Sequence, residues 1–267
     1  MNYNYIRYPL QYFIDSLVKM DIQNIELWAA SPHFYVEDIK LIDIKNFKRR
    51  LRDANLKLVC FTPEQCVYPI NIAAKEDAIR ERSLKYFFKS MEIAAELGSP
   101  ILLVTPGWGY FSETKKEAWL RSLESLRKLG EMASDLGINL ALEPLSPTSS
   151  NIINDVKDLK KMLVEINSPN VKGMIDTVQM AIIGDSLDYC INELGKDLIH
   201  MHFVDGNPWG HLAWGDGTLP LTEYLDILFK HEYKGYISLE ITDRKYYIEP
   251  EKAIQKSVSK ILSYIES

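Results

Sequence analysis

Four apolar runs in the second half of the chain each carry ionisable residues in or just after the run. "INLALEP" holds Glu143, "KGMIDT" holds Asp176, "LIHMHFVDG" holds His200 and His202, and "GYISLEIT" holds Glu240. Ionisable side chains are costly in a buried strand unless they are paired or bind something. These runs therefore mark a candidate site for chemistry.

The strand period predicts that the four ionisable positions face the same space. Side chains two residues apart share a face of a strand, so the apolar neighbours face one way and Glu143, Asp176, His202 and Glu240 face the other. Three carboxylates and an imidazole brought together would repel each other unless a cation lay among them. We therefore expect a divalent metal site, and a metal-free polar network is the alternative.

The donor types narrow the ion and the reaction. Three oxygen donors and one nitrogen donor without a thiolate favour one Mn²⁺, with Mg²⁺ or Co²⁺ as substitutes. Such an ion polarises a carbonyl and stabilises an enediolate. Glu143 and Glu240 lie on non-adjacent runs, so they could flank a substrate, one removing a proton from carbon and the other returning one. This chemistry is epimerisation beside a ketose carbonyl. Return of the proton to the neighbouring carbon would instead be aldose–ketose or keto-inositol isomerisation.

The apolar runs alternate with helix-like stretches along the whole chain. Short runs rich in Ile, Leu and Val follow helical stretches that stop near a glycine, a pattern typical of buried parallel strands. The expected strands are 3–7, 22–28, 57–62, 101–105, 138–143, 172–176, 198–204 and 236–241. The expected helices are 9–20, 36–54, 77–97, 113–136, 154–166, 180–194, 219–231 and 251–265.

Eight such alternations indicate an α/β fold, a closed (β/α)8 TIM barrel forming one domain over residues 1–267. An open doubly wound sheet is the alternative, but no dinucleotide-binding glycine pattern follows the first strand. Barrel enzymes place their chemistry at the C-terminal ends of the strands, where the four ionisable residues stand.

Composition excludes several other classes. The chain has 267 residues, a formal net charge of −6 and no basic run, so we expect no nucleic-acid partner. No apolar run approaches the length of a membrane span, and the N-terminal residues do not resemble a signal peptide. Cys60, Cys66 and Cys190 are an odd, scattered set, which suggests thiols in a reducing compartment and a cytoplasmic protein.

At the four ionisable positions of the candidate metal site, the sequence resembles the xylose isomerase-like TIM barrel superfamily of sugar epimerases and isomerases. The set Glu143, Asp176, His202 and Glu240 resembles the metal set of the tagatose/psicose-type ketose 3-epimerases. A closer likeness, to the fructoselysine 3-epimerases, is carried by "IELWAASPHFY", "FTPEQCVYPIN", "LEPLSPTSSNII" and "HMHFVDG". The resemblance covers nearly the whole chain. It implies that Glu143 and Glu240 are both metal ligands and the acid/base pair, and that the protein is a homodimer or homotetramer acting on a small sugar.

Some positions depart from the tagatose-type pattern. Gln179 stands where that group has a histidine, and Ser149 stands where it has a substrate-binding glutamate. Residues 203–212 lack the arginine of that group. The substrate, or the way it is held, is therefore expected to differ. An endonuclease-IV-like repair enzyme shares this barrel but would need more metal ligands and a basic face, and a catalytically silent sugar-binding protein would not need the pair Glu143 and Glu240.

Five residues are candidate substrate-binding residues. Asp205 follows the strand of His202, where it could hold the other nitrogen of that histidine or reach a sugar hydroxyl. His211 lies on the glycine-rich loop 205–217, which we expect to cover the sugar. His33 could bind hydroxyls or stabilise its loop, and Trp108 could form a wall against the sugar ring or pack in the core. Gln179, the fifth candidate, stands where the tagatose-type enzymes have a histidine.

Two further residues are expected to face the barrel interior. His200 shares the face of His202 lower in the barrel and is expected to support it, and Glu26 should pair with another inward residue.

Overall fold

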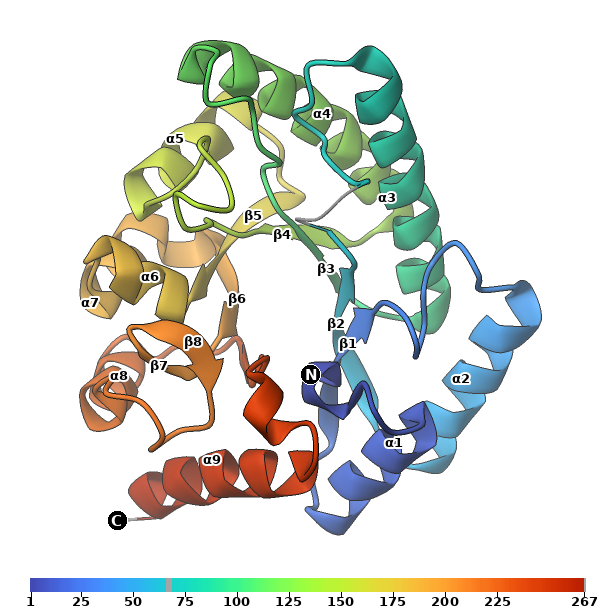
Figure 1. The fold of residues 1–267 in the computed structure, drawn as a ribbon, viewed down its shortest axis with the longest axis vertical. Coiled ribbons are helices and arrows are strands. Elements are labelled where there is room, and N and C mark those ends of the chain that lie inside the picture. Colours follow the sequence, from blue (N-terminus) through green and yellow to red (C-terminus); the bar gives the residue numbers. More distant parts are fainter. Residues whose placement is uncertain (66–68, 267) are drawn as a thin grey trace.

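A parallel sheet curls into a barrel that is surrounded by helices (Figure 1). The computed structural model describes residues 1–65 and 69–266. The strands of the barrel follow one another in chain order: β1 (Asn24–Ala29), β2 (Lys57–Pro63), β3 (Ile101–Val104), β4 (Asn139–Leu142), β5 (Val171–Asp176), β6 (Leu198–His202) and β9 (Tyr236–Ser238). Each neighbouring pair is parallel. The predicted (β/α) barrel is therefore confirmed, with seven strands in place of eight among the described residues.

Helices connect the strands and cover the outside of the barrel (Figure 1). They are α1 (Leu10–Lys19), α2 (Leu41–Asp53), α3 (Asp77–Leu97), α4 (Lys115–Leu136), α5 (Val156–Ile166), α6 (Thr177–Ile183), α7 (Leu187–Leu194), α8 (Leu221–Lys230) and α9 (Pro250–Ile265). The predicted helix 36–54 begins later, at Leu41. The predicted helix 180–194 is divided at Gly184, whose φ of 85° ends α6. None of the described helices is both long and apolar enough to cross a membrane.

The predicted first strand, 3–7, is wrong, because Tyr3–Tyr5 forms a 3-10 helix. Its aromatic side chains pack against neighbouring rings: Tyr5 lies 5.0 Å from Phe13 of α1, and Tyr3 lies 4.5 Å from Trp28, as measured between ring centroids. The side chain of Asn2 bonds the backbone of β1, as a neighbouring strand would. It accepts a hydrogen bond from the Trp28 N–H and donates one to the Trp28 carbonyl.

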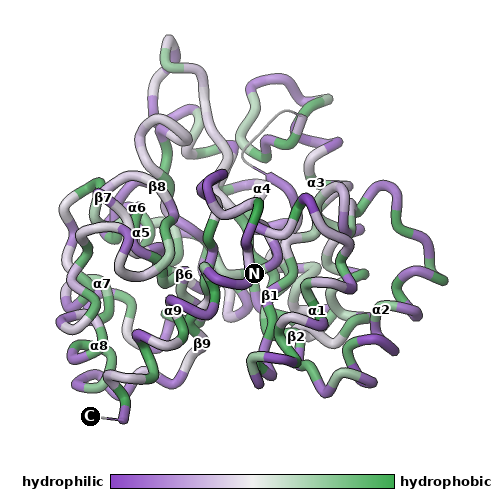
Figure 2. Tube along the Cα trace, turned by 60° about the horizontal axis from the view of Figure 1, so that its bottom comes forward, coloured by the Kyte–Doolittle hydropathy of each residue, from purple (hydrophilic) through white to green (hydrophobic). Residues whose placement is uncertain are grey.

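The N-terminal residues lie between β9 and β1 (Figure 2). Among the described residues no hydrogen bond joins these two strands, and their facing edges border a groove of about 210 Å³. The groove is lined mostly by apolar side chains of β1, β9, α1 and α9. Within the described part of the chain, the strand pairing around the barrel is therefore interrupted between β9 and β1.

The alternation of side chains along the strands is as predicted. Ala141 and Met174 lie in a small interior cluster with Cys60, Ile101 and Leu103. Their chain neighbours Leu140 and Ile175 instead belong to the large core between strands and helices. The inward phase of the predicted ionisable residues follows from this alternation.

The glycine-rich segment after β6 forms an antiparallel hairpin, which the sequence analysis did not predict. β7 (Asp205–Asn207) pairs with β8 (Trp209–Leu212) beside the barrel mouth. Cys60 and Cys190 are buried free thiols, and Cys66 lies outside the described residues.

Candidate metal centre

Four side chains meet where β4, β5, β6 and β9 end. Glu143, Asp176, His202 and Glu240 each present one donor atom, and these atoms all lie within 4.8 Å of one another. Glu143 directly follows β4, and its N–H continues the ladder to Val104 of β3 at 3.0 Å, which fixes the inward phase of its side chain. The structure thus brings together the four residues that the sequence analysis singles out as metal ligands.

The ring of His202 has two different surroundings. Its Nδ1 atom lies 3.1 Å from Glu240, 3.3 Å from Glu143 and 3.6 Å from Asp176, measured to carboxylate oxygens. This buried atom has no hydrogen-bond partner among the described residues. On the opposite side of the ring, Nε2 lies 3.1 Å from Oε1 of Glu26.

The hydrogen bond to Glu26 assigns the proton of a neutral His202 to Nε2, which leaves a lone pair on Nδ1. A lone pair facing three carboxylates is unfavourable unless a cation or a proton lies between them. Three carboxylate oxygens and one imidazole nitrogen are a donor set that suits a divalent metal ion. The residues present therefore fit such an ion.

The surroundings of these carboxylates give them unequal pKa values. Loss of solvent around Glu143 raises its pKa to about 7. Burial also opposes ionisation of Asp176, but His211 and His202 outweigh it and hold the pKa of Asp176 well below its usual range. Glu240 keeps 19% of its side chain exposed. The cluster thus combines a firmly ionised carboxylate with one that exchanges its proton near neutral pH.

Asp176 is oriented by the start of α6. Its Oδ1 atom accepts hydrogen bonds from the N–H groups of Val178 and Gln179 at 2.7 and 2.9 Å. Its Oδ2 atom remains directed at the cluster and accepts from Nε2 of His211 at 3.0 Å. One oxygen therefore anchors the side chain and the other faces the candidate ion.

The hairpin carries His211 into the site, a placement that strand phase could not predict. Nε2 of His211 also lies 3.4 Å from Glu240, and the His211 carbonyl accepts from the N–H of Thr242 just beyond that residue. Burial alone would lower the pKa of His211, but Asp176 outweighs it and raises the pKa to about 9. A protonated imidazole therefore stands at the edge of the cluster.

Glu26 of β1 lies beneath His202. Its Oε1 atom bonds Nε2 of His202 and also accepts a hydrogen bond from Thr62 of β2. Its Oε2 atom lies 2.9 Å from Nε2 of His200. His200 thus supports the site through Glu26, as its predicted place lower in the barrel suggested. The sequence predicts that Glu26 faces inward and pairs, but its contacts with His202 and Thr62 depend on strands distant in sequence and were not predicted.

His33 lies in the loop after β1 and contacts the N-terminal segment, and its contact with substrate stays a prediction. Its Nδ1 atom accepts from the Asn2 side chain at 2.9 Å, and its Nε2 atom donates to the Tyr8 carbonyl at 2.8 Å. Both ring nitrogens are therefore engaged in holding the N-terminal segment against the loop after β1. The alternative prediction, that His33 stabilises its loop, describes these contacts.

Asp205 contacts its own loop rather than His202, and its contact with a sugar hydroxyl stays a prediction. The carboxylate is 1% exposed and accepts from the backbone N–H groups of Gly206, Gly215, Gly217 and Leu219 at 2.8–3.0 Å. The second nitrogen of His202 is bound by Glu26 instead. Asp205 therefore organises the loop that follows the hairpin.

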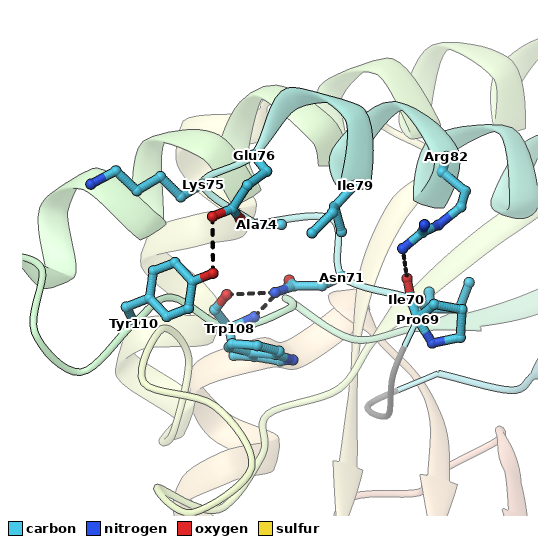
Figure 3. A pocket seen from close by; sticks show the side chains of 10 residues that line it. All are labelled: Pro69, Ile70, Asn71, Ala74, Lys75, Glu76, Ile79, Arg82, Trp108 and Tyr110. Carbon is cyan, nitrogen blue, oxygen red and sulfur yellow. Dashed lines mark hydrogen bonds between the residues drawn. The ribbon is translucent and has the colours of Figure 1, made fainter.

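Gln179 and Trp108 lie in different surroundings. Oε1 of Gln179 accepts from the N–H of Ser146 at 2.8 Å, which ties α6 to the loop after β4. Trp108 lines a pocket of about 90 Å³ with Tyr110 and Asn71 (Figure 3). The Asn71 side chain bonds both the N–H and the carbonyl of Trp108, which holds the backbone of this segment. A contact of Gln179 or Trp108 with substrate stays a prediction.

Two curated relatives of this chain are sugar 3-epimerases. The chain is 27% identical over 237 residues to fructoselysine 3-epimerase of Escherichia coli O157:H7, a match that covers 88% of this chain and 86% of the relative. It is 25% identical over 237 residues to D-psicose 3-epimerase of Ruminiclostridium cellulolyticum, covering 86% of this chain and 77% of that one.

Solved structures show the same fold. The structure of 3-keto-D-glucoside 4-epimerase from E. coli superposes with a TM-score of 0.80 at 22% identity, covering 94% of this chain and 92% of that chain. D-psicose 3-epimerase from Clostridium cellulolyticum H10, solved with D-tagatose, gives 0.75 at 21% identity and covers 94% and 93%. Residues 14–264 match the family described as xylose isomerase-like TIM barrel. The chain therefore belongs to the xylose isomerase-like TIM barrel family.

Proposed function

We propose that this chain is a divalent-metal-dependent sugar epimerase that inverts the carbon next to a ketose carbonyl. The observation that carries the proposal is the convergence of Glu143, Asp176, His202 and Glu240, with Nδ1 of His202 facing three carboxylates. The similarity to curated 3-epimerases along most of the chain supports this type of enzyme.

The four residues would hold one ion, for which Mn²⁺ fits best and Mg²⁺ or Co²⁺ are substitutes. When bound, the ion supplies charge that polarises the substrate carbonyl and stabilises the enediolate formed from it. Asp176 and His202 are the two ligands without a further role. Both are oriented on their far side by other residues, Asp176 by amides of α6 and His202 by Glu26.

Glu143 and Glu240 are the proposed acid/base pair. They come from β4 and from the end of β9, which β5 and β6 separate in the sheet, so the two carboxylates approach the site from different sides. One carboxylate takes the proton from carbon, and the electron pair of the C–H bond becomes part of the enediolate. The other, in its acid form, gives a proton to the opposite face of that carbon.

His211 is the proposed substrate-binding residue with the strongest support. Its protonated ring reaches the cluster from the hairpin and can donate to a sugar oxygen there. Gln179 and Trp108 are proposed to contact substrate from the rim. The chain lacks the histidine and glutamate that the tagatose-type enzymes have at positions 179 and 149, so His211 would take a larger share of sugar binding.

We also propose a single domain over residues 1–267, a homodimer or homotetramer, and a location in the cytoplasm. The buried free thiols Cys60 and Cys190 suit a reducing compartment. Light scattering of the purified chain measures its oligomeric state, and a monomer at all concentrations would contradict the assembly.

A panel of ketoses, fructosamines and inososes incubated with the chain and Mn²⁺ in D₂O, followed by NMR, tests the function. We expect deuterium at an inverted carbon beside the carbonyl of one panel member. Deuterium at the neighbouring carbon, with aldose formed, would show an isomerase instead. No deuterium in any panel member would contradict the proposal for these sugar classes.

A further inference from the structure

The buried carboxylate of Glu26 lies on the far side of His202 from the candidate ion, where it touches none of the three carboxylates. We propose that Glu26 is a positioning residue that fixes both the proton and the orientation of the His202 ring, so that Nδ1 is presented to the metal. This inference rests on the proposed metal centre.

The carboxylate of Glu26 is bound by three neighbouring side chains. Its side chain is 0% exposed and accepts hydrogen bonds from His202, His200 and Thr62. Oε1 accepts from His202 and Thr62, and Oε2 accepts from His200. An ionised carboxylate only accepts hydrogen bonds, so each of the three partners must present a donor. The carboxylate is thus held from β2 and β6 at once.

This arrangement selects one tautomer of His202. With the proton on Nε2, the ring donates to Glu26 and its Nδ1 lone pair faces the site. With the proton on Nδ1 alone, the Nε2 lone pair would lie 3.1 Å from an ionised carboxylate oxygen, a repulsive contact in a buried place. That tautomer would also block the donor atom that the ion needs. Glu26 therefore favours the form of His202 that can bind a metal.

Glu26 also restricts rotation of the ring. His202 is 1% exposed, and its ring lies 5.7 Å from that of His200 in an edge-on arrangement. Because both rings donate to the same carboxylate, turning either one breaks a charge-assisted hydrogen bond. A carboxylate that accepts from the second nitrogen of a metal-bound histidine also increases the basicity of that ligand.

Replacement of Glu26 by glutamine separates positioning from packing, because the two side chains have nearly the same shape. In Glu26→Gln the amide can satisfy either tautomer of His202, so the preference is lost. We expect the dissociation constant for Mn²⁺, measured by competition with a chelator, to rise about 10- to 100-fold. Thr62→Val, which removes one donor to Glu26 but leaves His202 untouched, is expected to have a smaller effect in the same direction.

Glu165→Gln is the matched control. Glu165 of α5 accepts a hydrogen bond from the Trp119 ring at 2.7 Å, outside the cluster, so this variant loses the same charge without touching the site. We expect its affinity for Mn²⁺ to be unchanged. The far-ultraviolet circular dichroism and the melting temperature of each variant show whether it is folded. A folded Glu26→Gln chain that binds Mn²⁺ within twofold of the unaltered chain would overturn the proposal.

A second measurement needs no variant. Nitrogen-15 NMR of the unaltered chain loaded with diamagnetic Mg²⁺ reports which nitrogen of each histidine carries a proton. We expect His202 to be protonated at Nε2 alone, and a proton on Nδ1 would overturn the proposal even if Glu26→Gln does not fold. If the unaltered chain binds neither Mn²⁺ nor Mg²⁺, the proposed function fails and the role of Glu26 fails with it. If it binds and Glu26→Gln binds equally well, only the role of Glu26 fails.

Discussion

The Nε2 atom of His202 lies 3.1 Å from Oε1 of Glu26, and its Nδ1 atom on the other side of the ring lies 3.1 Å from Oε2 of Glu240. One imidazole therefore connects a carboxylate from the first strand of the barrel with a carboxylate from the last. The first contact is a hydrogen bond, and the second is a close approach without one. This difference between the two sides of one ring is the structural basis for the predictions about the site.

The variant Glu240→Gln should lose proton exchange. Since Glu240 is proposed to move a proton at the reacting carbon, we expect deuterium uptake from solvent to fall by about 10²–10⁴-fold, the usual contribution of a positioned acid or base. NMR of the substrate in D₂O measures this rate with Mn²⁺ at saturation. Glu223→Gln, on the exposed side of α8, is the control and should exchange at the normal rate. Undiminished exchange in Glu240→Gln would remove Glu240 from the mechanism.

The variant His211→Gln should weaken substrate binding. Because the protonated ring is proposed to donate to a sugar oxygen, we expect KM to rise about tenfold, the equivalent of one hydrogen bond to a charged group. Steady-state kinetics give this value. The control is His231→Gln, whose ring pairs with Asp188 at 2.8 Å on the outside of the barrel. An unchanged KM in His211→Gln would show that the hairpin only covers the site.

The variant Asp205→Asn should destabilise the fold. The buried carboxylate accepts four backbone N–H groups, and an asparagine turns part of that acceptor into a donor facing them. We expect the free energy of unfolding to fall by about 2–4 kcal/mol in urea titrations, since hydrogen bonds to a charged group each contribute about 1.5–3 kcal/mol. Asp216→Asn, which weakens the surface pairing of Asp216 with Lys256 and its hydrogen bond from Tyr246, should cost about 1 kcal/mol or less. Equal losses for the two variants would contradict the role of Asp205 in its loop.

Metal binding should stabilise the chain more as the pH rises. Burial raises the pKa of Glu143 to about 7 in the chain without metal, above the ordinary value near 4.5. Between these values the unfolded chain ionises at Glu143 and the folded chain does not, so this group lowers the stability of the metal-free fold as the pH rises. The ion requires the ionised form, so below pH 7 its binding must also release this proton. We expect the rise in melting temperature caused by Mn²⁺ to be larger at pH 8 than at pH 6, and a rise that does not change with pH would contradict this coupling.

Strand geometry explains why the four-residue cluster could be predicted. Parallel strands end at the same side of a barrel and their side chains alternate, so Glu143, Asp176, His202 and Glu240 could be placed from sequence alone. Helix ends could be predicted at glycines for a similar local reason. Gly98 and Gly137 end α3 and α4 because each adopts the left-handed conformation.

Features that depend on partners distant in sequence could not be predicted. Whether 3–7 forms a strand was decided by where Tyr3 and Tyr5 pack and by the pairing of Asn2 with Trp28, none of which alters the local apolar pattern. The contacts of His33 and Asp205 depend in the same way on backbone groups elsewhere in the chain. The place of His211 depends on a hairpin whose pairing leaves no alternating hydrophobic pattern in "DGNPWGHL".

The most direct test of the metal centre is the anomalous scattering of a crystal of the chain loaded with Mn²⁺. We predict one strong peak per chain at bonding distance from Nδ1 of His202 and from oxygens of Glu143, Asp176 and Glu240, with Nε2 of His202 still on Glu26. A loaded crystal with no peak among these four side chains, or with the peak bound elsewhere, would contradict the account.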